Sequence, residues 1–323
     1  MVNMLEMWYD MLKYSYLIVT MIIWLKRFIF KGEKMGTTEF GVDRCDETRS
    51  LLALSVDELL LRSKGHLVVK PTLDELYEYL AEKMVAEFEK SARKGEPVGF
   101  IMPVGPVQPY RLMAQKINQK NISLKNCWFF FMDEYCDEND QLIAETHPLS
   151  FRGQIKGLLF DLINEKLLMP SGQVVFPRPD NLARLPALIE SVGGIEVCYG
   201  GIGIHGHVAF NEPAIGIKDT NPRILDINEF TRTVDATRHG LGGNLVNFPR
   251  KAITLGMKQC LAARKLLLMT RNEHQGMDWA NTVLRIAALG KPGDDYPVTY
   301  VRSKENYIIA TDFATASAPQ III

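Results

Sequence analysis

A short segment near the middle of the chain, residues 199–213, concentrates side chains that could do acid/base chemistry. It reads YGGIGIHGHVAFNEP and places His205, His207 and Glu212 among four glycines. Imidazole is the side chain that ordinarily titrates nearest neutrality, and a neighbouring carboxylate can support its proton. The two histidines could also bind a metal together with Asp133, although this spacing permits a metal without requiring one. We expect an acid/base site and no metal.

The glycines of this segment raise a second interpretation, a cradle for the phosphates of a dinucleotide. The string GIGIHG fits the pattern G-x-G-x-x-G, but that pattern must open a long helix. Asn211, Glu212 and Pro213 interrupt the chain before such a helix could form. The segment therefore argues against a nicotinamide cofactor, and we expect no cofactor.

Apolar runs alternate with helical patterns along the chain. The runs lack the polar alternation of a half-exposed strand, which is typical of parallel strands buried on both faces. The expected strands are residues 66–70, 98–103, 127–132, 195–200, 252–256, 265–269 and 307–311. The expected helices are residues 71–88, 149–168 and 180–192, with another through Leu112 and Ile117. The pattern predicts an α/β fold: a doubly wound, mostly parallel sheet with helices on both faces.

Three of the expected strands run into unusual loops. These loops begin with Val104-Gly105-Pro106, with Asp133-Glu134-Tyr135, and with the glycine-histidine segment. Parallel strands present their carboxyl ends at one edge, where ligands of open α/β sheets bind. This geometry selects Asp133, His205, His207 and Glu212 as candidate site residues. Each residue type also has a non-catalytic explanation. Asp133 could cap the turn that follows it, and His207 could be a structural histidine held by hydrogen bonds.

Composition narrows the class of partner. The chain has 323 residues and a formal net charge of −1, which gives no support for a nucleic-acid surface. Its five cysteines are widely spaced and form no CxxC pair, so they predict reduced, mostly buried thiols and no zinc finger. A reducing compartment, and thus a cytoplasmic location, is the expectation.

The N-terminal part differs from the rest. Residues 1–34 form an apolar extension or leader, in which residues 14–30 are interrupted by Lys26 and Arg27. The uninterrupted part is shorter than the roughly 20 residues of a membrane span, which leaves membrane contact through residues 14–30 as the less favoured alternative. Residues 35–64 are expected to be a linker or pre-domain segment, and residues 65–323 the catalytic domain.

Three strings in this order resemble the glucosamine-6-phosphate deaminase/isomerase family. They are FFMDEYC at residues 130–136, THPLSFRGQI at 146–155 and GGIGIHGHVAFNEP at 200–213. The resemblance runs from about residue 66 to residue 316. The related 6-phosphogluconolactonases have a similar glycine-histidine loop but lack AFNEP and MDEY. The resemblance implies the deaminase-like α/β fold, isomerisation of an amino sugar or its phosphate with loss of ammonia, no redox cofactor, and a homo-oligomer as one option.

The resemblance also implies roles for residues. Asp133 would be the base that moves a proton between C2 and C1, His207 would protonate the ring oxygen, and Glu212 would support His207. His205 stands where the family usually has a carboxylate. The residue expected beside His207 is therefore one that becomes positively charged on ionisation, whereas a carboxylate becomes negatively charged. Further candidates for contact with the substrate are Gly105, Glu134, Gly201 and Gly203.

The expected phosphate pocket departs from the family pattern. Val104-Gly105-Pro106 offers no hydroxyl group, and it has one backbone N–H donor fewer than the family's first loop because proline has none. His274 stands where the family has a lysine. A phosphate would then be held by Arg238, Arg271 and protonated His274. Two alternatives stay open: a non-catalytic sugar-binding protein of the same fold, and a lactonase-like hydrolase.

Overall fold

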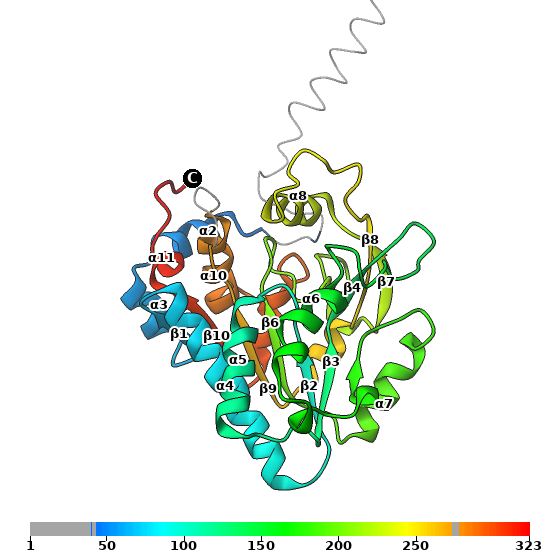
Figure 1. The fold of residues 1–323 in the computed structure, drawn as a ribbon. Coiled ribbons are helices and arrows are strands. Elements are labelled where there is room, and N and C mark those ends of the chain that lie inside the picture. The colour runs from blue at the N-terminus through cyan, green and yellow to red at the C-terminus, as the bar shows by residue number, and fades with distance from the viewer. Residues whose placement is uncertain (1–39, 41–42, 273–277) are drawn as a thin grey trace, which may run out of the picture. The chain divides into compact units, whose positions relative to one another are not determined.

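The computed structural model describes residue 40, residues 43–272 and residues 278–323 (Figure 1). The apolar extension 1–34, the segment 14–30 within it, and His274 lie outside the described residues. Contacts within the chain group residues 46–323 into one compact unit, distinct from residues 1–45. Among the described residues, no helix has both the length and the apolar character needed to cross a membrane.

The larger of two sheets has seven strands, all paired in parallel. In spatial order they are β1 (Leu67–Lys70), β10 (Tyr307–Asp312), β9 (Lys265–Met269), β6 (Ile195–Gly201), β2 (Val98–Met102), β3 (Cys127–Phe131) and β5 (Val174–Val175). The predicted doubly wound parallel sheet is confirmed. Six of the strands lie within one or two residues of the ranges expected from the apolar runs, and the two-residue strand β5 was not expected.

Alternate side chains of each strand enter two separate hydrophobic cores. In β3, Phe129 and Phe131 join one core and Phe130 joins the other. The first core is covered by α4 (Leu73–Lys94), α5 (Gln108–Lys120) and α6 (Phe151–Leu158). The second is covered by α2 (Cys45–Leu52), α3 (Val56–Arg62), α7 (Leu185–Ser191), α9 (Met257–Leu261), α10 (Trp279–Leu289) and α11 (Phe313–Ala316). Helices thus cover both faces, as predicted.

The compact unit begins earlier than the expected boundary at residue 65. Residues 46–64, expected as a linker or pre-domain segment, contain most of α2 and all of α3. Leu51, Leu54 and Leu59 of this segment are buried in the second core. Residues 46–64 therefore pack in the same compact unit as the residues that follow them. These helices have only eight and seven residues, too short for a clear helical period in the sequence.

A second, three-stranded antiparallel sheet projects from the ends of the parallel strands. Its order is β4 (Asp133–Cys136), β8 (Lys251–Thr254) and β7 (Arg223–Asp226). Residues 133–136 were expected in a loop, which is wrong, because Asp133 and Glu134 disfavour a strand by propensity while pairing with β8 imposes one. The long helix expected over residues 149–168 is also shorter: α6 ends at Leu158, and short 3₁₀ turns follow it.

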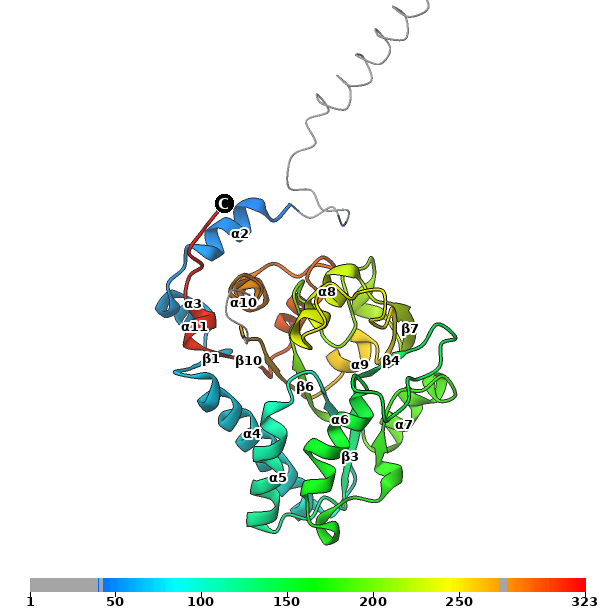
Figure 2. The same cartoon turned by 45° about the horizontal axis from the view of Figure 1, so that its top comes forward.

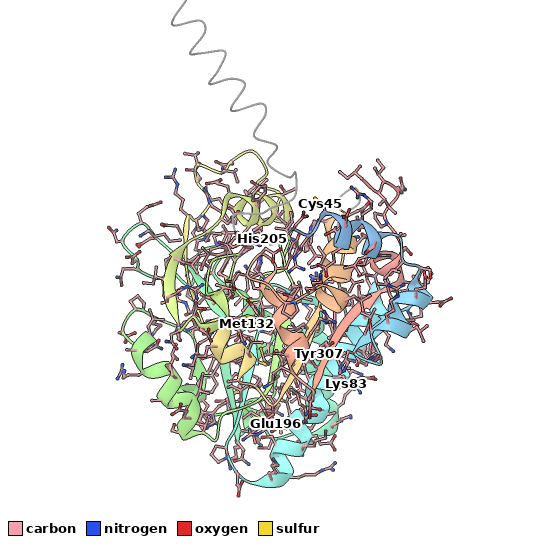
Figure 3. The ribbon with its side chains drawn as sticks, turned by 180° about the vertical axis from the view of Figure 1, so that it is seen from behind. Cys45, Lys83, Met132, Glu196, His205 and Tyr307 are labelled. Carbon is pink, nitrogen blue, oxygen red and sulfur yellow. The ribbon has the colours of Figure 1, made fainter. Side chains whose placement is uncertain are left out.

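The chain reverses its direction of growth across the large sheet between β2 and β6. Strands β2, β3 and β5 extend the sheet one way, and β6, β9 and β10 extend it the other way. Ligands of doubly wound folds bind beyond the carboxyl ends of the strands at this switch point. Figure 2 brings this edge forward, with α8 (Glu229–Arg238) lying close to the end of β6. Figure 3 places His205 at this edge and Glu196, near the start of β6, at the opposite one.

Candidate active site

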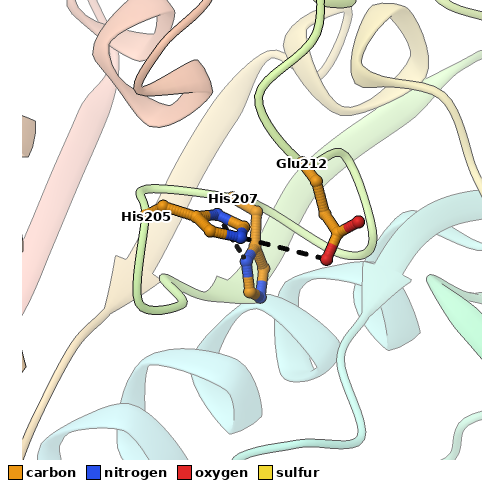
Figure 4. Close-up of side chains that lie close together, drawn as sticks. All are labelled: His205, His207 and Glu212. Carbon is orange, nitrogen blue, oxygen red and sulfur yellow. Dashed lines mark hydrogen bonds and ion pairs between the residues drawn. The ribbon is translucent and has the colours of Figure 1, made fainter. Parts of the chain in front are cut away.

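A tight turn after β6 brings the two histidines together. The backbone N–H of Gly203 donates to the carbonyl of His207 at 3.0 Å, and that of Gly206 donates to the carbonyl of Gly203 at 2.9 Å. Gly206 has φ +72°, in the left-handed region that favours glycine. The result is a pair of imidazoles whose Nδ1 atoms lie 3.3 Å apart and whose ring centroids lie 4.9 Å apart (Figure 4).

Gly203 positions one of these rings by its lack of a side chain. A Cβ atom built on Gly203 would lie 1.9 Å from Nε2 of His207, so only glycine lets the imidazole lie against the backbone here. We expected Gly203 to line the substrate. Its geometry instead makes it the support for the ring of His207.

Replacing Gly203 by alanine should therefore lower turnover by about 10²-fold, because the methyl group displaces the imidazole by an ångström or more. The matched control is Gly172→Ala, since Gly172 has ordinary backbone angles and no atom within 4 Å of an added Cβ. Steady-state kinetics on both variants, with their melting temperatures, make the comparison. Equal turnover in the two variants would show that the position of the His207 ring does not limit the reaction.

Glu212 lies beside His205. Its Oε2 accepts a hydrogen bond from the backbone N–H of Asn228 at 2.8 Å. Its Oε1 lies 3.9 Å from Nε2 of His205, which is also 3.2 Å from the hydroxyl of Thr231. His205 is thus in contact with both Glu212 and His207, and one ligand atom from each of the three side chains lies within 4.8 Å of the others. The support of His207 by Glu212 stays a prediction.

Both imidazoles are held in their neutral form. Burial lowers the pKa of His205 to about 4. The pKa of His207 is lowered well below its usual value by burial, then by His205 and by the nearby guanidinium of Arg238. At neutral pH this pair offers N–H donors and nitrogen lone pairs, not an imidazolium.

Asp133 opens β4 directly after the buried strand β3. It is 7% exposed, and its carboxylate forms no hydrogen bond with any residue that the structure describes. Burial raises its pKa well above the ordinary value, and the nearby carboxylates of Glu134 and Asp235 add to the effect. A buried carboxylate that no protein donor engages is suited to accept a proton from carbon.

Its neighbour Glu134 is engaged on both oxygens. Oε1 accepts from the backbone N–H groups of Tyr135 and Phe151, each at 2.9 Å. Oε2 accepts from the hydroxyl of Ser150 and the backbone N–H of Arg152, each at 2.9 Å, and from Nε of Arg152 at 3.3 Å. Glu134 is fully buried. These hydrogen bonds tie β4 to the first turn of α6, and contact of Glu134 with a substrate stays a prediction.

A cavity of about 390 Å³ opens at the same end of the sheet. Its wall includes Gly105 of the first loop, and Asp235 and Arg238 of α8. Nη1 of Arg238 lies 3.6 Å from Oδ1 of Asp235, and its guanidinium lies 5.3 Å from the centre of the Trp279 ring. Gly105 and Arg238, both expected near the substrate, therefore share one cavity.

Arg271, the second arginine expected to hold a phosphate, lies behind the wall of this cavity. It is 6% exposed, and its Nε donates to the hydroxyl of Tyr77 at 3.0 Å while Nη2 donates to Oε1 of Gln108 at 3.4 Å. Tyr77 and Gln108 themselves line the cavity. Arg271 thus adds positive charge near the first residue of α5 without facing the cavity directly. Val104 is buried and apolar, as the sequence indicated.

The two loops at the switch point lie against each other. A methyl group on Gly201, at the end of β6, would lie 3.7 Å from Cδ of Pro106 in the first loop. The end of β6 and the first loop therefore lie near each other at the switch point.

One face of α8 supplies two contacts that sequence reasoning missed, those of Thr231 and Asp235, beside the expected Arg238. Thr231 reaches His205, Asp235 accepts from the hydroxyl of Tyr135 at 3.2 Å, and Arg238 lines the cavity. These positions are spaced by four and three residues, which puts them on one side of a helix. The spacing was present in the sequence, but nothing local showed which side of this helix would meet the site.

Comparisons with known proteins support the resemblance. A glucosamine-6-phosphate deaminase of Porphyromonas gingivalis is 28% identical over 256 residues, which cover 77% of this chain and 91% of that protein. Glucosamine-6-phosphate deaminase 2 of Bacillus subtilis is 26% identical over 256 residues, 77% of this chain and 96% of that protein. No protein-family profile matches the chain.

Solved structures agree on the fold. A monomeric glucosamine-6-phosphate deaminase superposes with a TM-score of 0.67 at 20% identity, covering 78% of this chain and 99% of that one. The 6-phosphogluconolactonase of Thermotoga maritima superposes with a TM-score of 0.56 at 18% identity, covering 76% and 99%. The chain is therefore a divergent relative of the glucosamine-6-phosphate deaminases, built on the fold seen in both groups of enzymes.

Proposed function

We propose that the protein isomerises a 2-amino-2-deoxy aldose phosphate of the glucosamine 6-phosphate class and releases ammonia. The observation that carries the proposal is the buried, unengaged carboxylate of Asp133, at the same sheet edge as the histidine turn and the cavity of Arg238. The similarity to glucosamine-6-phosphate deaminases over most of the chain supports this substrate class.

Asp133 is the base of the proposed reaction. With the sugar ring open, its carboxylate takes the proton from C2 and returns it to C1, which moves the double bond so that C2 becomes an imine. Water then adds to that imine, and ammonia leaves to give the ketose phosphate. The raised pKa of Asp133 makes the carboxylate a stronger proton acceptor than an exposed one.

The histidine turn serves ring opening. His207 carries an N–H that can donate to the ring oxygen if His205 donates its own Nδ1–H to Nδ1 of His207 across the 3.3 Å contact. In that tautomer the hydroxyl of Thr231 donates to Nε2 of His205. The contacts from Thr231 through His205 to His207 therefore set the tautomer of a neutral donor, and need no imidazolium.

Arg238 binds the phosphate end of the substrate in this proposal. It is the arginine that lines the cavity, and its ion pair with Asp235, at 3.6 Å, is long enough to be exchanged for a phosphate. A charge-assisted hydrogen bond of this kind contributes about 1.5–3 kcal/mol. Gly105 allows the sugar to approach the backbone of the first loop, since no atom lies within 4 Å of an added Cβ there.

Replacing Arg238 by methionine should lower kcat/KM for the phosphorylated sugar by about 10- to 150-fold, because one charge-assisted hydrogen bond is lost. Activity on the same sugar without phosphate should fall far less. The control is Arg93→Met, on the exposed surface of α4. An equal loss on both sugars in Arg238→Met would show that the arginine does not bind the phosphate.

The function itself is tested by incubating the full chain with glucosamine 6-phosphate and measuring ammonia, fructose 6-phosphate and exchange of the C2 hydrogen in D₂O. We expect all three. Binding without exchange would indicate a non-catalytic sugar-binding protein. Hydrolysis of 6-phosphogluconolactone without isomerisation would indicate a lactonase. Either result would overturn the proposal.

A further inference from the structure

Three potential metal ligands converge at the histidine turn. His205, His207 and Glu212 each place one ligand atom within 4.8 Å of the others (Figure 4). They form the one such three-residue group found among the described residues, and Asp133, the carboxylate that the sequence suggested for this purpose, does not belong to it. The ligands come from one loop of eight residues, which the turn at Gly206 closes on itself.

The chemistry of the three groups suits a metal ion. Oε1 of Glu212 is buried and, within the described part of the chain, has no hydrogen-bond partner. A buried carboxylate oxygen without a donor is costly unless a cation or a proton satisfies it. Neutral imidazole is a common metal ligand. The guanidinium groups of Arg238 and Arg223 are the nearby opposing charges, and Asp235 lies 3.6 Å from Arg238.

The spacing of the nitrogens points to a particular class of metal. Two nitrogens bound to one Zn²⁺ at 2.0–2.1 Å in tetrahedral geometry lie about 3.3 Å apart. The Nδ1 atoms of His205 and His207 lie 3.3 Å apart. Oε1 of Glu212 lies 3.9 Å from Nε2, the other nitrogen of the His205 ring. One ligand atom from each of the three residues lies within 4.8 Å of the others, so binding of a common ion requires the Glu212 side chain or the His205 ring to rotate. Two nitrogens and one carboxylate oxygen favour Zn²⁺ or a similar transition metal over Mg²⁺ and Ca²⁺, which prefer oxygen alone.

We propose that His205, His207 and Glu212 form a binding site for one divalent transition-metal ion of the Zn²⁺ class, with the fourth position left to water or to a sugar oxygen. The proposal goes beyond the isomerase function and does not depend on it. An ion here replaces the hydrogen bond between the two imidazoles, and it polarises whatever oxygen occupies the fourth position. His205 is the specificity-determining member, because without it only His207 and Glu212 are left to bind the ion.

The test uses the full chain, stripped with a chelator and dialysed, with no substrate present. Calorimetry with Zn²⁺ in a competing chelator should show one ion per chain, and Mg²⁺ should give no binding. Co²⁺ should give the intense visible absorption of a four-coordinate site, without thiolate charge-transfer bands. Metal loading should also raise the melting temperature, because the ion binds the folded state.

Variants assign the site. His205→Asn should weaken Zn²⁺ binding by at least roughly 100-fold, since a ligand matters more than the outer partners whose loss costs 10–100-fold. Glu212→Gln, which keeps the shape, should weaken it as well, and circular dichroism shows that both variants are folded. The matched controls are His147→Asn, an exposed histidine, and Cys45→Ser, the exposed thiol. No stoichiometric Zn²⁺ binding, unchanged affinity in His205→Asn, or loss of binding in Cys45→Ser would overturn the proposal.

Discussion

Asp133→Asn is expected to lower kcat by about 10²–10⁴-fold, the usual contribution of a positioned general base. The amide has nearly the shape of the carboxylate, so KM should change little, which distinguishes lost chemistry from lost binding. The carboxylate is 7% exposed and unengaged by any described donor, so its removal leaves no hydrogen-bond donor of the protein without a partner. Steady-state kinetics with glucosamine 6-phosphate give kcat and KM.

The control for this variant is Asp161→Asn, which removes a half-exposed carboxylate on the surface. Exchange of the C2 hydrogen of the substrate with deuterium from D₂O reports proton abstraction alone, so it distinguishes a role of Asp133 as the base from any other role. If Asp133→Asn exchanges that hydrogen as fast as the wild type, Asp133 does not abstract the proton, whatever happens to kcat.

The raised pKa of Asp133 has two consequences of opposite sign. Because the base must be ionised, turnover should rise with pH through a pKa that lies above the ordinary carboxyl range. The folded state also binds this proton more tightly than the unfolded state does. The contribution of Asp133 to the free energy of unfolding therefore falls as the pH rises from the ordinary carboxyl pKa through the raised pKa of Asp133 in the folded state. Asp133→Asn should therefore be the more stable protein at pH 8, by an amount of the order of 1 kcal/mol, and the gain should vanish at low pH.

Sequence reasoning placed the candidate site residues at one edge of the sheet because the large sheet is buried on both faces. Uninterrupted apolar runs such as CWFFF in β3 could only be parallel strands between two layers of helices. Once the strands are parallel, their carboxyl ends share an edge. Asp133, Gly105 and the histidine turn were therefore brought together by topology alone, before any side-chain geometry was known.

Sequence reasoning did not reach the contacts that depend on how separate elements pack. Glu212 follows His207 closely in the chain, yet its Oε1 lies 3.9 Å from Nε2 of His205, because the turn at Gly206 and a second turn at residues 208–211 fold the segment back. The pairing of β4 with β8 overrode the poor strand propensity of Asp133 and Glu134. The side of α8 that meets the histidines is set by how that helix packs, and no residue within it carries that information.

Two adjacent carboxylates, Asp133 and Glu134, show how contacts between separate elements decide what a residue does. Both are acidic, both are buried and both follow β3, so residue type, burial and place in the chain do not separate them. Their surroundings do. Asp133 has no donor among the described residues, whereas Glu134 accepts from the backbone of Phe151 and Arg152 and from the hydroxyl of Ser150, all in the first turn of α6.

Glu134→Ala should therefore lower the free energy of unfolding by about 3–5 kcal/mol, as expected when one partner of a buried charge network is removed. The loss leaves the N–H groups at the start of α6 and the guanidinium of Arg152 without their acceptor. Urea unfolding followed by circular dichroism measures it, and Glu138→Ala, an exposed carboxylate on the same segment, is the control. Glu134→Gln, which keeps one acceptor oxygen, should lose less stability and leave KM nearly unchanged. A raised KM with unaltered stability in Glu134→Gln would show instead that Glu134 contacts the substrate, and that the anchoring of α6 does not depend on it.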